Sequence, residues 1–239
     1  MSLKIGKYMI EDDEEFGSGG YGQIFLARDG EEGGDKKHLY VIKIPKEEKM
    51  TGEDKKTFNN EIDILNILSK IPNNKYTSII YDSQKFDAGE GLPFYVMDFF
   101  SKGLLYDYVF SGSMKERLAK YIFRKIILGF QFLHSNGICH LDIKIENIIF
   151  DKDFWPVIID FGFSKKYKNE NGEITPQTID NGTKQYIAPE IYRGEEFNGE
   201  KVDIFSLGAT LFNLVIRGYG FGSSEEEDHL YKLIKKKEV

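Results

Sequence analysis

Cysteine is nearly absent from this 239-residue sequence: Cys139 stands alone, so no disulfide can form within the chain. A single thiol fits a reducing compartment, and we expect a cytoplasmic location, with the nucleus left open. No apolar stretch approaches the roughly 20 residues that a membrane-spanning helix requires, so we expect no membrane partner. The residues after Met1 lack the apolar region of a signal peptide, and Ser2 occupies the position where N-myristoylation requires glycine.

Clustered basic residues are also scarce. The chain carries 32 Lys and Arg against 39 Asp and Glu, a net charge of −7, and no basic block precedes the lysines at 235–237. Because binding to a phosphate backbone requires clustered Lys and Arg, we expect no nucleic-acid partner. Hydrophobic residues make up 41% of the chain, which is enough for a sizeable core in one large or two small domains.

The first hundred residues have the pattern of strands separated by turns. Short apolar runs at 39–44 and 94–100 predict strands, and the polar, glycine-rich stretch 30–37 predicts a hairpin turn. Over residues 55–70 the apolar side chains recur at helical spacing, which predicts a helix that ends before Pro72.

The pattern changes near residues 99–102. Farther along, the spacing of residues predicts helices over 114–135 and 202–216. The residues that define the amphipathic pattern of the first helix are Leu118, Tyr121, Ile122, Lys125, Leu128, Phe132 and Leu133. Two short strands are expected at 148–150 and 157–159, and the polar stretch 169–181 is expected to be a mobile loop. The sequence therefore predicts a strand-rich small part and a helix-rich large part.

A glycine motif of the form G-x-G-x-x-G lies near the N-terminus and consists of Gly17, Ser18, Gly19, Gly20, Tyr21 and Gly22. In a dinucleotide-binding fold the last glycine opens a helix, whereas Gly22 leads into the strand-like stretch 23–27. Glycines between two strands allow backbone N–H groups to approach a phosphate closely. A flexible hairpin without a ligand is the plainer alternative.

The strongest candidates for catalysis and metal binding lie in the run from His140 to Asn147 and in the following Asp160, Phe161 and Gly162. Asp142 can accept a proton as a general base. Asn147, five positions later, and Asp160, eighteen positions later, offer oxygen ligands of the kind that magnesium prefers. Any one of these residues alone could be a turn or cap residue, but their order and spacing make chance a poor explanation.

Together with Lys43 at the end of the run 40–43, and with the segment 182–190 ending in Ala-Pro-Glu, these pieces resemble the eukaryotic protein kinases of serine/threonine type. The resemblance covers about residues 8–234. It implies an α+β, two-lobed fold, with a kinase domain at 5–239, a β-rich small lobe at about 5–98 and a mainly helical large lobe at about 101–239 whose end is missing. Residues 160–165 resemble the calcium/calmodulin-dependent group.

The resemblance implies transfer of the γ-phosphoryl group of ATP, with Mg²⁺, to Ser or Thr of a protein substrate. It makes Asp142 the catalytic base, gives Lys144 the role of neutralising the transferring phosphoryl group, and makes Asn147 and Asp160 the metal ligands. The residues that it assigns to ATP binding are Gly17, Ser18, Gly19, Gly20, Tyr21, Gly22, Ile24, Val41, Lys43, Glu61, Met97, Asp98, Phe100 and Ile149.

Three structural roles follow from the same resemblance. Lys43 should pair with Glu61 on the following helix. His140 should pack behind Phe161, and a buried Asp203 should accept hydrogen bonds from the backbone of the catalytic loop.

The chain departs from the family pattern at the activation loop. Leu141 replaces an Arg that binds a phosphothreonine in many kinases, and the usual phosphothreonine position holds Ile179. We therefore predict a kinase without this phosphorylation switch. Thr175 and Thr178 lie nearby and keep a displaced phosphorylation site open.

Another departure is the length of the large lobe, which in this family continues for several more helices. We expect a fragment, a partner chain that covers the incomplete lobe, or a lobe of marginal stability. The alternative function is a pseudokinase or nucleotide-binding scaffold that regulates a partner. Leu104, which replaces an acidic residue, and Leu141 favour it, whereas the presence of Lys43, Asp142 and Asp160 disfavours it. A non-protein kinase is a more distant alternative.

Overall fold

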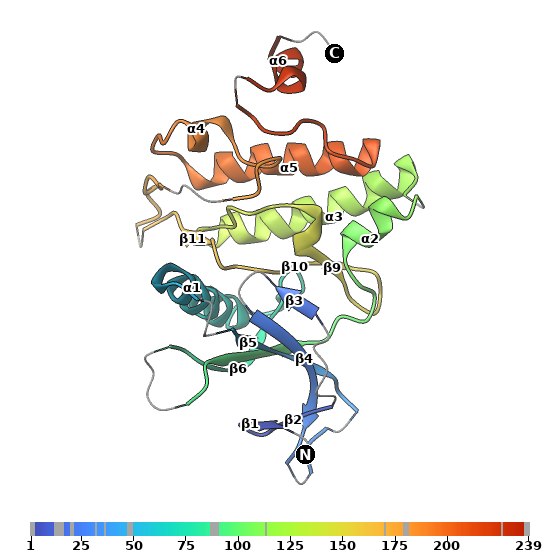
Figure 1. The fold of residues 1–239 in the computed structure, drawn as a ribbon, viewed down its shortest axis with the longest axis vertical. Helices are drawn as coiled ribbons and strands as arrows, with labels where there is room; N and C mark the ends of the chain where they lie inside the picture. Colours follow the sequence, from blue (N-terminus) through green and yellow to red (C-terminus); the bar gives the residue numbers. More distant parts are fainter. Residues whose placement is uncertain are drawn as a thin grey trace. The chain divides into compact units, whose positions relative to one another are not determined.

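The computed structural model describes residues 3–11, 17–19, 22–31, 33–35, 37–46, 50–86, 91–112, 114–169, 171–178, 182–225 and 227–236, with backbone alone at 17–19. The chain divides into two compact units, Met1–Phe99 and Phe100–Val239, here called unit 1 and unit 2 (Figure 1). Unit 1 is rich in strands and unit 2 is mainly helical, which confirms the predicted α+β class. No helix among the described residues is long and apolar enough to cross a bilayer.

Unit 1 is built on an antiparallel sheet. Along the sheet the strands lie in the order β1 (Lys4–Ile5), β2 (Tyr8–Ile10), β4 (Gly22–Asp29), β5 (Tyr40–Pro45), β7 (Phe94–Asp98) and β6 (Ile80–Gln84), and β3 (Gly17–Gly19) pairs with β4. At Gly22 an added Cβ would lie 2.7 Å from the carbonyl oxygen of Ile44. Only glycine therefore allows β4 and β5 to approach each other this closely at the end of the glycine motif.

Helix α1 (Gly52–Ser69) follows β5 and begins three residues before the predicted start. The cause is a capping box: the hydroxyl of Thr51 accepts from the backbone N–H of Asp54, and the Asp54 carboxylate accepts from the N–H of Thr51. These bonds satisfy backbone donors that the helix leaves free, so the apolar pattern alone does not mark the start.

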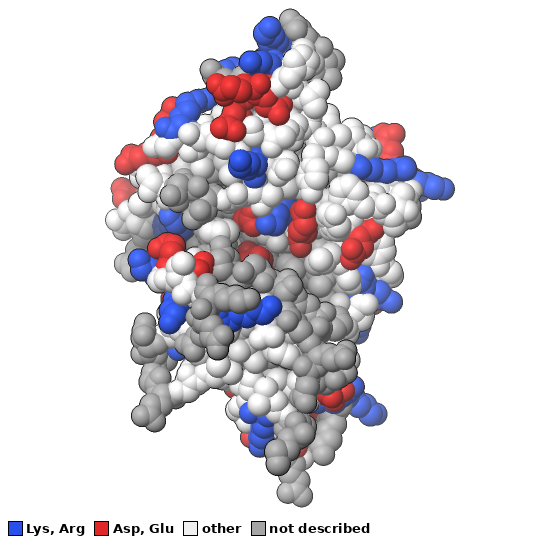
Figure 2. All heavy atoms as spheres, in the orientation of Figure 1, with Lys and Arg blue, Asp and Glu red and all other residues white. Residues whose placement is uncertain are grey.

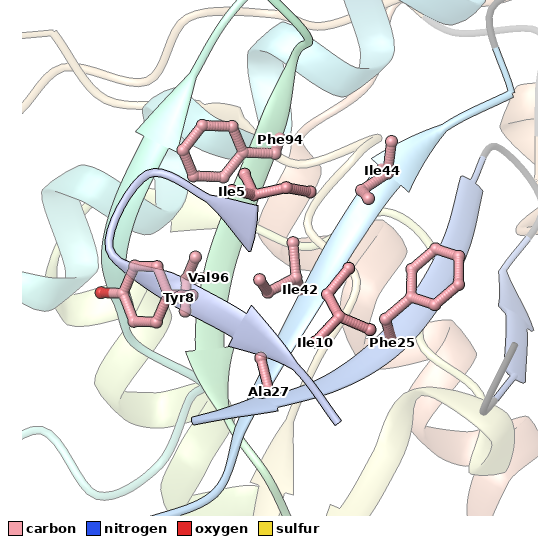
Figure 3. Close-up of a cluster of buried hydrophobic side chains, with 9 residues drawn as sticks. All are labelled: Ile5, Tyr8, Ile10, Phe25, Ala27, Ile42, Ile44, Phe94 and Val96. Carbon is pink, nitrogen blue, oxygen red and sulfur yellow. The ribbon is translucent and has the colours of Figure 1, made fainter. Parts of the chain in front are cut away.

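The two faces of the sheet are different. A buried apolar cluster covers one face and consists of Ile5, Tyr8, Ile10, Phe25, Ala27, Ile42, Ile44, Phe94 and Val96 (Figure 3). Because successive side chains in a strand point to opposite faces, Val41 and Lys43 lie on the face away from this cluster. The register of β5 thus separates core residues from the residues predicted to bind ATP.

Unit 2 contains the helices α2 (Leu105–Phe110), α3 (Glu116–Ser135), α4 (Pro189–Tyr192), α5 (Gly199–Ile216) and α6 (His229–Lys236), with the short turn η2 (Ile145–Asn147). Its strands form two antiparallel pairs, β9 (Ile148–Phe150) with β10 (Pro156–Ile158), and β8 (Ile138–Cys139) with β11 (Lys165–Lys166). Helices α3 and α5 pack against each other. The predicted strand at 148–150 is confirmed, and its partner begins one residue earlier than predicted.

Helix α3 lies where the sequence predicts it, and its predicted apolar face is confirmed in part: Ile122 and Leu133 are buried, whereas three other predicted members are exposed. Leu118, Tyr121 and Leu128 are 44%, 57% and 40% exposed. The buried side is formed by Ala119, Ile122, Ile126, Gly129, Phe130, Leu133 and His134. The small residues Ala119 and Gly129 share this side with large apolar residues, so the large apolar residues alone indicate only part of the buried face.

The polar stretch after β11 contains isolated bridges in its described part. Lys168 pairs with Ile174, and Gln177 pairs with Phe197. Ile179 lies outside the described residues. On the face of the molecule drawn in Figure 2, acidic and basic side chains are mixed.

Candidate active site

In unit 1, four of the residues predicted to bind ATP share one face of the sheet. Ile24 is the cross-strand partner of Lys43, and Val41 is the partner of Met97. Partners directly opposite each other point to the same face, and so do Val41 and Lys43, which are two residues apart. This register gives three apolar side chains around one lysine.

Lys43 donates a hydrogen bond to Glu61 of α1 over 2.9 Å, as the sequence predicted. Both side chains are nearly enclosed, with 7% and 4% of their surfaces exposed. The Lys43 ammonium also lies 5.4 Å from the centre of the Tyr95 ring. A buried ion pair of this kind is costly to break, because removing one partner leaves an uncompensated charge.

The remaining candidates in unit 1 lie at its turns and at the end of β7. Gly19 and Gly22 are partners at the turn between β3 and β4, whereas Gly20 and Tyr21 lie outside the described residues. Asp98 is the last residue of β7, and its carboxylate accepts from the hydroxyl of Tyr81 over 2.9 Å and lies 2.8 Å from Nε2 of His38. Its side chain is therefore occupied within unit 1, which leaves its backbone groups as candidates for binding adenine.

In unit 2, Asp142 is the centre of a polar network. Its Oδ2 accepts from Lys144 Nζ over 2.6 Å and from Asn147 Nδ2 over 3.0 Å, and its Oδ1 accepts from the hydroxyl of Thr183 over 3.0 Å. Lys144 Nζ also donates to the Thr183 hydroxyl over 2.9 Å. Asp142 is 6% exposed, so three side chains fix the orientation of a buried carboxylate.

Asn147 is oriented by Asp142 on one side of its amide. Its Nδ2 donates to the backbone oxygen of Asp142 over 2.9 Å as well as to the carboxylate. The amide oxygen is thereby left as the atom available to a metal. The backbone N–H of Ile159 donates to the carbonyl of Asn147 over 3.0 Å, which holds the neighbouring Asp160 beside this loop. An amide oxygen and a carboxylate are a donor set that fits Mg²⁺.

Asp160 has a left-handed backbone, with φ of +64°, and Leu141 has φ of +65°. Such conformations cost of order 1–3 kcal/mol for residues other than glycine, and they persist only where surrounding contacts hold them. Asp160 is itself a predicted metal ligand, and Leu141 directly precedes the predicted catalytic base Asp142. The left-handed backbone of Leu141 is held by contacts to its N–H group and to its side chain.

Asp203 of α5 holds the backbone of Leu141 in this conformation. Its two carboxylate oxygens accept from the consecutive backbone N–H groups of His140 and Leu141, over 2.8 and 2.9 Å. Asp203 is fully buried and its Oδ2 also lies 2.7 Å from Nε2 of His134. The His140 ring packs against Phe161 with 5.1 Å between ring centres. These contacts confirm the structural roles predicted for His140 and Asp203.

Packing holds the Leu141 side chain. Leu141 is 4% exposed and belongs to an apolar cluster, here called the Leu141 cluster, with Cys139, Tyr167, Ala188, Ile191, Phe197 and Val202. Burial raises the pKa of the Cys139 thiol far above its ordinary value, so this residue is part of the core. The cluster joins the loop that carries Asp142 to residues on both sides of the segment 182–190.

Ile149 and Thr183 complete the description of the site in unit 2. Ile149 is half-buried on β9, where it forms a bridge with Leu104. Thr183 contacts both Asp142 and Lys144, although no role of its own was predicted for it. The signal that could have found it was its place in the segment 182–190, but a 41-residue separation from Asp142 hides the contact.

Comparison with known proteins agrees with this geometry. A family model described as a protein kinase domain matches residues 10–239, so the chain belongs to the protein kinase family.

Among its curated relatives are three protein kinases. The chain is 32% identical over 225 residues to the human protein "NUAK family SNF1-like kinase 1". The aligned stretch covers 93% of this chain and 31% of the relative. The chain is 34% identical over 225 residues to "NUAK family SNF1-like kinase 2" of Rattus norvegicus, covering 93% and 33%. It is 31% identical over 211 residues to "Probable serine/threonine-protein kinase MARK-C" of Dictyostelium discoideum, covering 88% and 26%. The chain thus spans about a third of the length of these relatives.

Proposed function

We propose that this chain is a serine/threonine protein kinase that transfers the γ-phosphoryl group of ATP to a hydroxyl of a protein substrate. The observation that carries the proposal is the Asp142 network. A buried carboxylate is oriented by Lys144, Asn147 and Thr183, within reach of a residue pair suited to magnesium. A general base and a metal-binding pair held together in this way are the requirements of phosphoryl transfer.

In the proposed reaction, the oxygen of a Ser or Thr hydroxyl forms a bond to the γ-phosphorus while the bond to the β-phosphate oxygen breaks. ADP leaves, and the hydroxyl proton passes to the Asp142 carboxylate. Lys144 stabilises the negative charge of the transferring group. Magnesium, held by Asn147 and Asp160, would neutralise charge on the phosphate oxygens.

ATP binding is assigned to the face of the unit 1 sheet that lies away from the buried apolar cluster. Ile24, Val41 and Met97 offer an apolar surface to the adenine ring, and Lys43, held by Glu61, offers a positive charge to the phosphates. Gly22 supports the phosphate-binding turn, because its missing side chain allows close approach of backbone groups. The backbone of Asp98 and Phe100 completes the proposed adenine contacts.

The choice of Ser or Thr over Tyr is supported by Lys144 and by the segment 182–190, both of which resemble serine/threonine kinases. The word "serine/threonine" in the name of the Dictyostelium relative agrees with it.

We also propose that activity does not depend on phosphorylation of the activation loop. A phosphothreonine orders this loop in many kinases through a charged contact, which Leu141 cannot make. In its place, the Leu141 cluster joins the catalytic loop to Tyr167, Ala188 and Ile191 by apolar burial. Such burial requires no modification, so the segment can be ordered in the unmodified chain.

An ATP-dependent phosphorylation assay on a generic protein substrate tests the proposal. The wild-type chain should incorporate phosphate on Ser or Thr, and Asp142→Asn should lower kcat by about 10²- to 10⁴-fold, because general-base catalysis contributes that much. The matched control is Asp153→Asn, an exposed residue of the turn between β9 and β10, which should retain full activity. Thermal melting would show that both variants are folded.

Failure of the wild-type chain to transfer phosphate would sink the proposal. If it bound ATP without turnover, the pseudokinase or scaffold alternative would gain. Equal activity of Asp142→Asn and wild type would exclude Asp142 as the base. Phosphate found on Tyr alone would overturn the choice of substrate hydroxyl.

A further inference from the structure

Asn213 is a polar side chain in the interior of α5, whose sequence is otherwise mostly apolar near this point. It is 2% exposed, and a buried amide must find partners for its N–H and C=O groups. With its side-chain oxygen directed at Tyr186, that oxygen accepts from the Tyr186 hydroxyl over 2.6 Å. Its nitrogen then donates to the carbonyl oxygens of Ala209 and Gly218, over 3.2 and 2.9 Å. This orientation satisfies both ends of the amide.

These contacts join two separate segments of unit 2. Tyr186 belongs to the segment 182–190, in which its backbone N–H donates to the carbonyl of Thr183 over 2.8 Å. Gly218 follows the end of α5, where Arg217 adopts a left-handed backbone and its N–H donates to the Asn213 carbonyl over 2.9 Å. Asn213 therefore fixes the exit of α5 as well as the ring of Tyr186.

Both segments converge on Glu146, which lies in the same loop as Asp142 and Lys144. The carboxylate oxygens of Glu146 lie 3.2 Å from the hydroxyls of Tyr186 and Tyr219, one oxygen to each. The two tyrosine rings meet edge to face, with 6.3 Å between centres. Tyr219 directly follows Gly218 and is 43% exposed, so this cluster continues from the core to the surface.

The Tyr186 hydroxyl carries a single proton and faces two acceptors. The Asn213 oxygen at 2.6 Å is closer than the Glu146 oxygen at 3.2 Å, so the proton is held mainly by Asn213. Burial, with the Glu146 charge as a further cause, raises the pKa of Tyr186 above its ordinary value, so the hydroxyl keeps this proton. Asn213 thereby sets where the Tyr186 ring lies relative to the catalytic loop.

We infer that Asn213 is a positioning residue for the protein substrate, which acts through Tyr186 and through the Gly218–Tyr219 turn. The inference rests on the proposed kinase function. Thr183, one turn before Tyr186, contacts the carboxylate of Asp142, so a protein that presents its hydroxyl to Asp142 must lie against this segment. Asn213 itself is buried and touches neither ATP-binding residues nor the Asp142 network among the described residues.

The test is Asn213→Leu, a change of similar size that removes every hydrogen bond of the amide. We expect the KM for a peptide substrate, and its directly measured Kd, to rise about tenfold, since a lost buried hydrogen bond is worth about one decade in affinity. The KM for ATP and kcat should stay within about twofold, because among the described residues Asn213 contacts neither the predicted ATP-binding residues nor the Asp142 network. Tyr186→Phe, which keeps the ring and removes the proton, should give the same pattern.

The double variant Asn213→Leu/Tyr186→Phe should lose less than the sum of the two single losses, because each single variant removes the shared hydrogen bond between Asn213 and Tyr186. The matched control is Thr210→Val on the same helix, where a buried hydroxyl donates to the Ser206 carbonyl over 2.9 Å rather than to Tyr186. It should lower thermal stability without raising the peptide KM.

The inference is overturned if Asn213→Leu leaves peptide KM and Kd unchanged, or if Thr210→Val raises them equally. Parallel losses in kcat and ATP affinity would also overturn it, because they would show a general effect on the fold. Should Asn213→Leu fail to fold, Tyr186→Phe decides: a selective rise in peptide Kd supports the inference, and an unchanged value removes it. An inactive wild-type chain would instead defeat the proposed function, and peptide Kd would still report on Asn213.

Discussion

Each unit of this chain has a lysine–carboxylate pair among its candidate site residues, and these two pairs are built differently. In unit 1, Lys43 and Glu61 are 18 residues apart and meet over 2.9 Å between a strand and a helix. In unit 2, Lys144 and Asp142 are two residues apart and meet over 2.6 Å within a loop. The side chain of Lys144 is 19% exposed, whereas that of Lys43 is 7% exposed.

The difference shows how each kind of site obtains its rigidity. Lys43 and Glu61 are held by regular secondary structure, since β5 is paired on both sides and α1 is capped at its start. The loop of Asp142 and Lys144 has no such scaffold of its own. It depends on Asp203, which binds two backbone N–H groups, and on the Leu141 cluster. The same chemical pair can therefore be positioned by a sheet and helix or by contacts from distant elements.

Among the variants that test this comparison, Lys43→Met should cause the largest loss of activity and stability. Loss of the charge should lower kcat/KM by about 10²- to 10³-fold, as for other preorganised groups that stabilise charge in the transition state. It should also destabilise unit 1 by about 3–5 kcal/mol, because the buried Glu61 carboxylate loses the positive charge of its Lys43 partner. Kinase assays and denaturant titration measure the two effects.

The double variant Lys43→Met/Glu61→Leu separates the two effects of this prediction. It should recover most of the lost stability, since no buried charge remains, but none of the activity. Recovery of activity would show that the charge of Lys43 has no role in the reaction.

A smaller effect is expected from Leu141→Ala, which tests the support of the catalytic loop. The change should destabilise unit 2 by about 2–5 kcal/mol, because a buried leucine leaves a cavity when it is truncated. Leu128→Ala on the exposed side of α3 is the matched control and should cost well under half of that amount. Equal losses in chemical denaturation would mean that the Leu141 cluster contributes no special support.

Thr183→Val should cause the next largest effect, which is a loss of activity. Valine keeps the shape but loses the hydroxyl that donates to Asp142 and accepts from Lys144. Hydrogen bonds to charged groups are worth about 1.5–3 kcal/mol, so kcat/KM should fall by about 10- to 100-fold. Thr183→Ser should retain most of the activity in the same assay, and a matching loss in the serine variant would point to the methyl group instead.

The smallest effect is predicted for the double variant Thr175→Ala/Thr178→Ala. Both side chains are exposed, and Lys165 Nζ donates to the backbone oxygen of Thr178, a contact that alanine preserves. We expect activity within about twofold of wild type, because in the proposed function the apolar burial around Leu141 takes the place of a phosphate contact. Loss of most activity with an unchanged circular dichroism spectrum would restore a phosphorylation switch at these threonines.

Local patterns predicted much of the fold and the candidate site. Apolar spacing located α1, α3 and α5, because a helix must bury one side. It identified only part of the buried side of α3, because Ala119 and Gly129 are also covered and Tyr121 is exposed. The start of α1 was missed because hydrogen bonds of Thr51 and Asp54 decide it. Thr183 was missed because its contact with Asp142 spans 41 residues.

By itself, the sequence determined the class of protein and the residues that could carry its chemistry, because their identity and spacing within short segments are local properties of the chain. Only the tertiary structure decided the contacts that neither the resemblance nor a local pattern indicated. The hydrogen bond between Thr183 and Asp142 and the burial of Leu141 in its apolar cluster join segments that are distant in sequence. Folding brings such segments together through packing and buried hydrogen bonds, and no local pattern specifies those contacts.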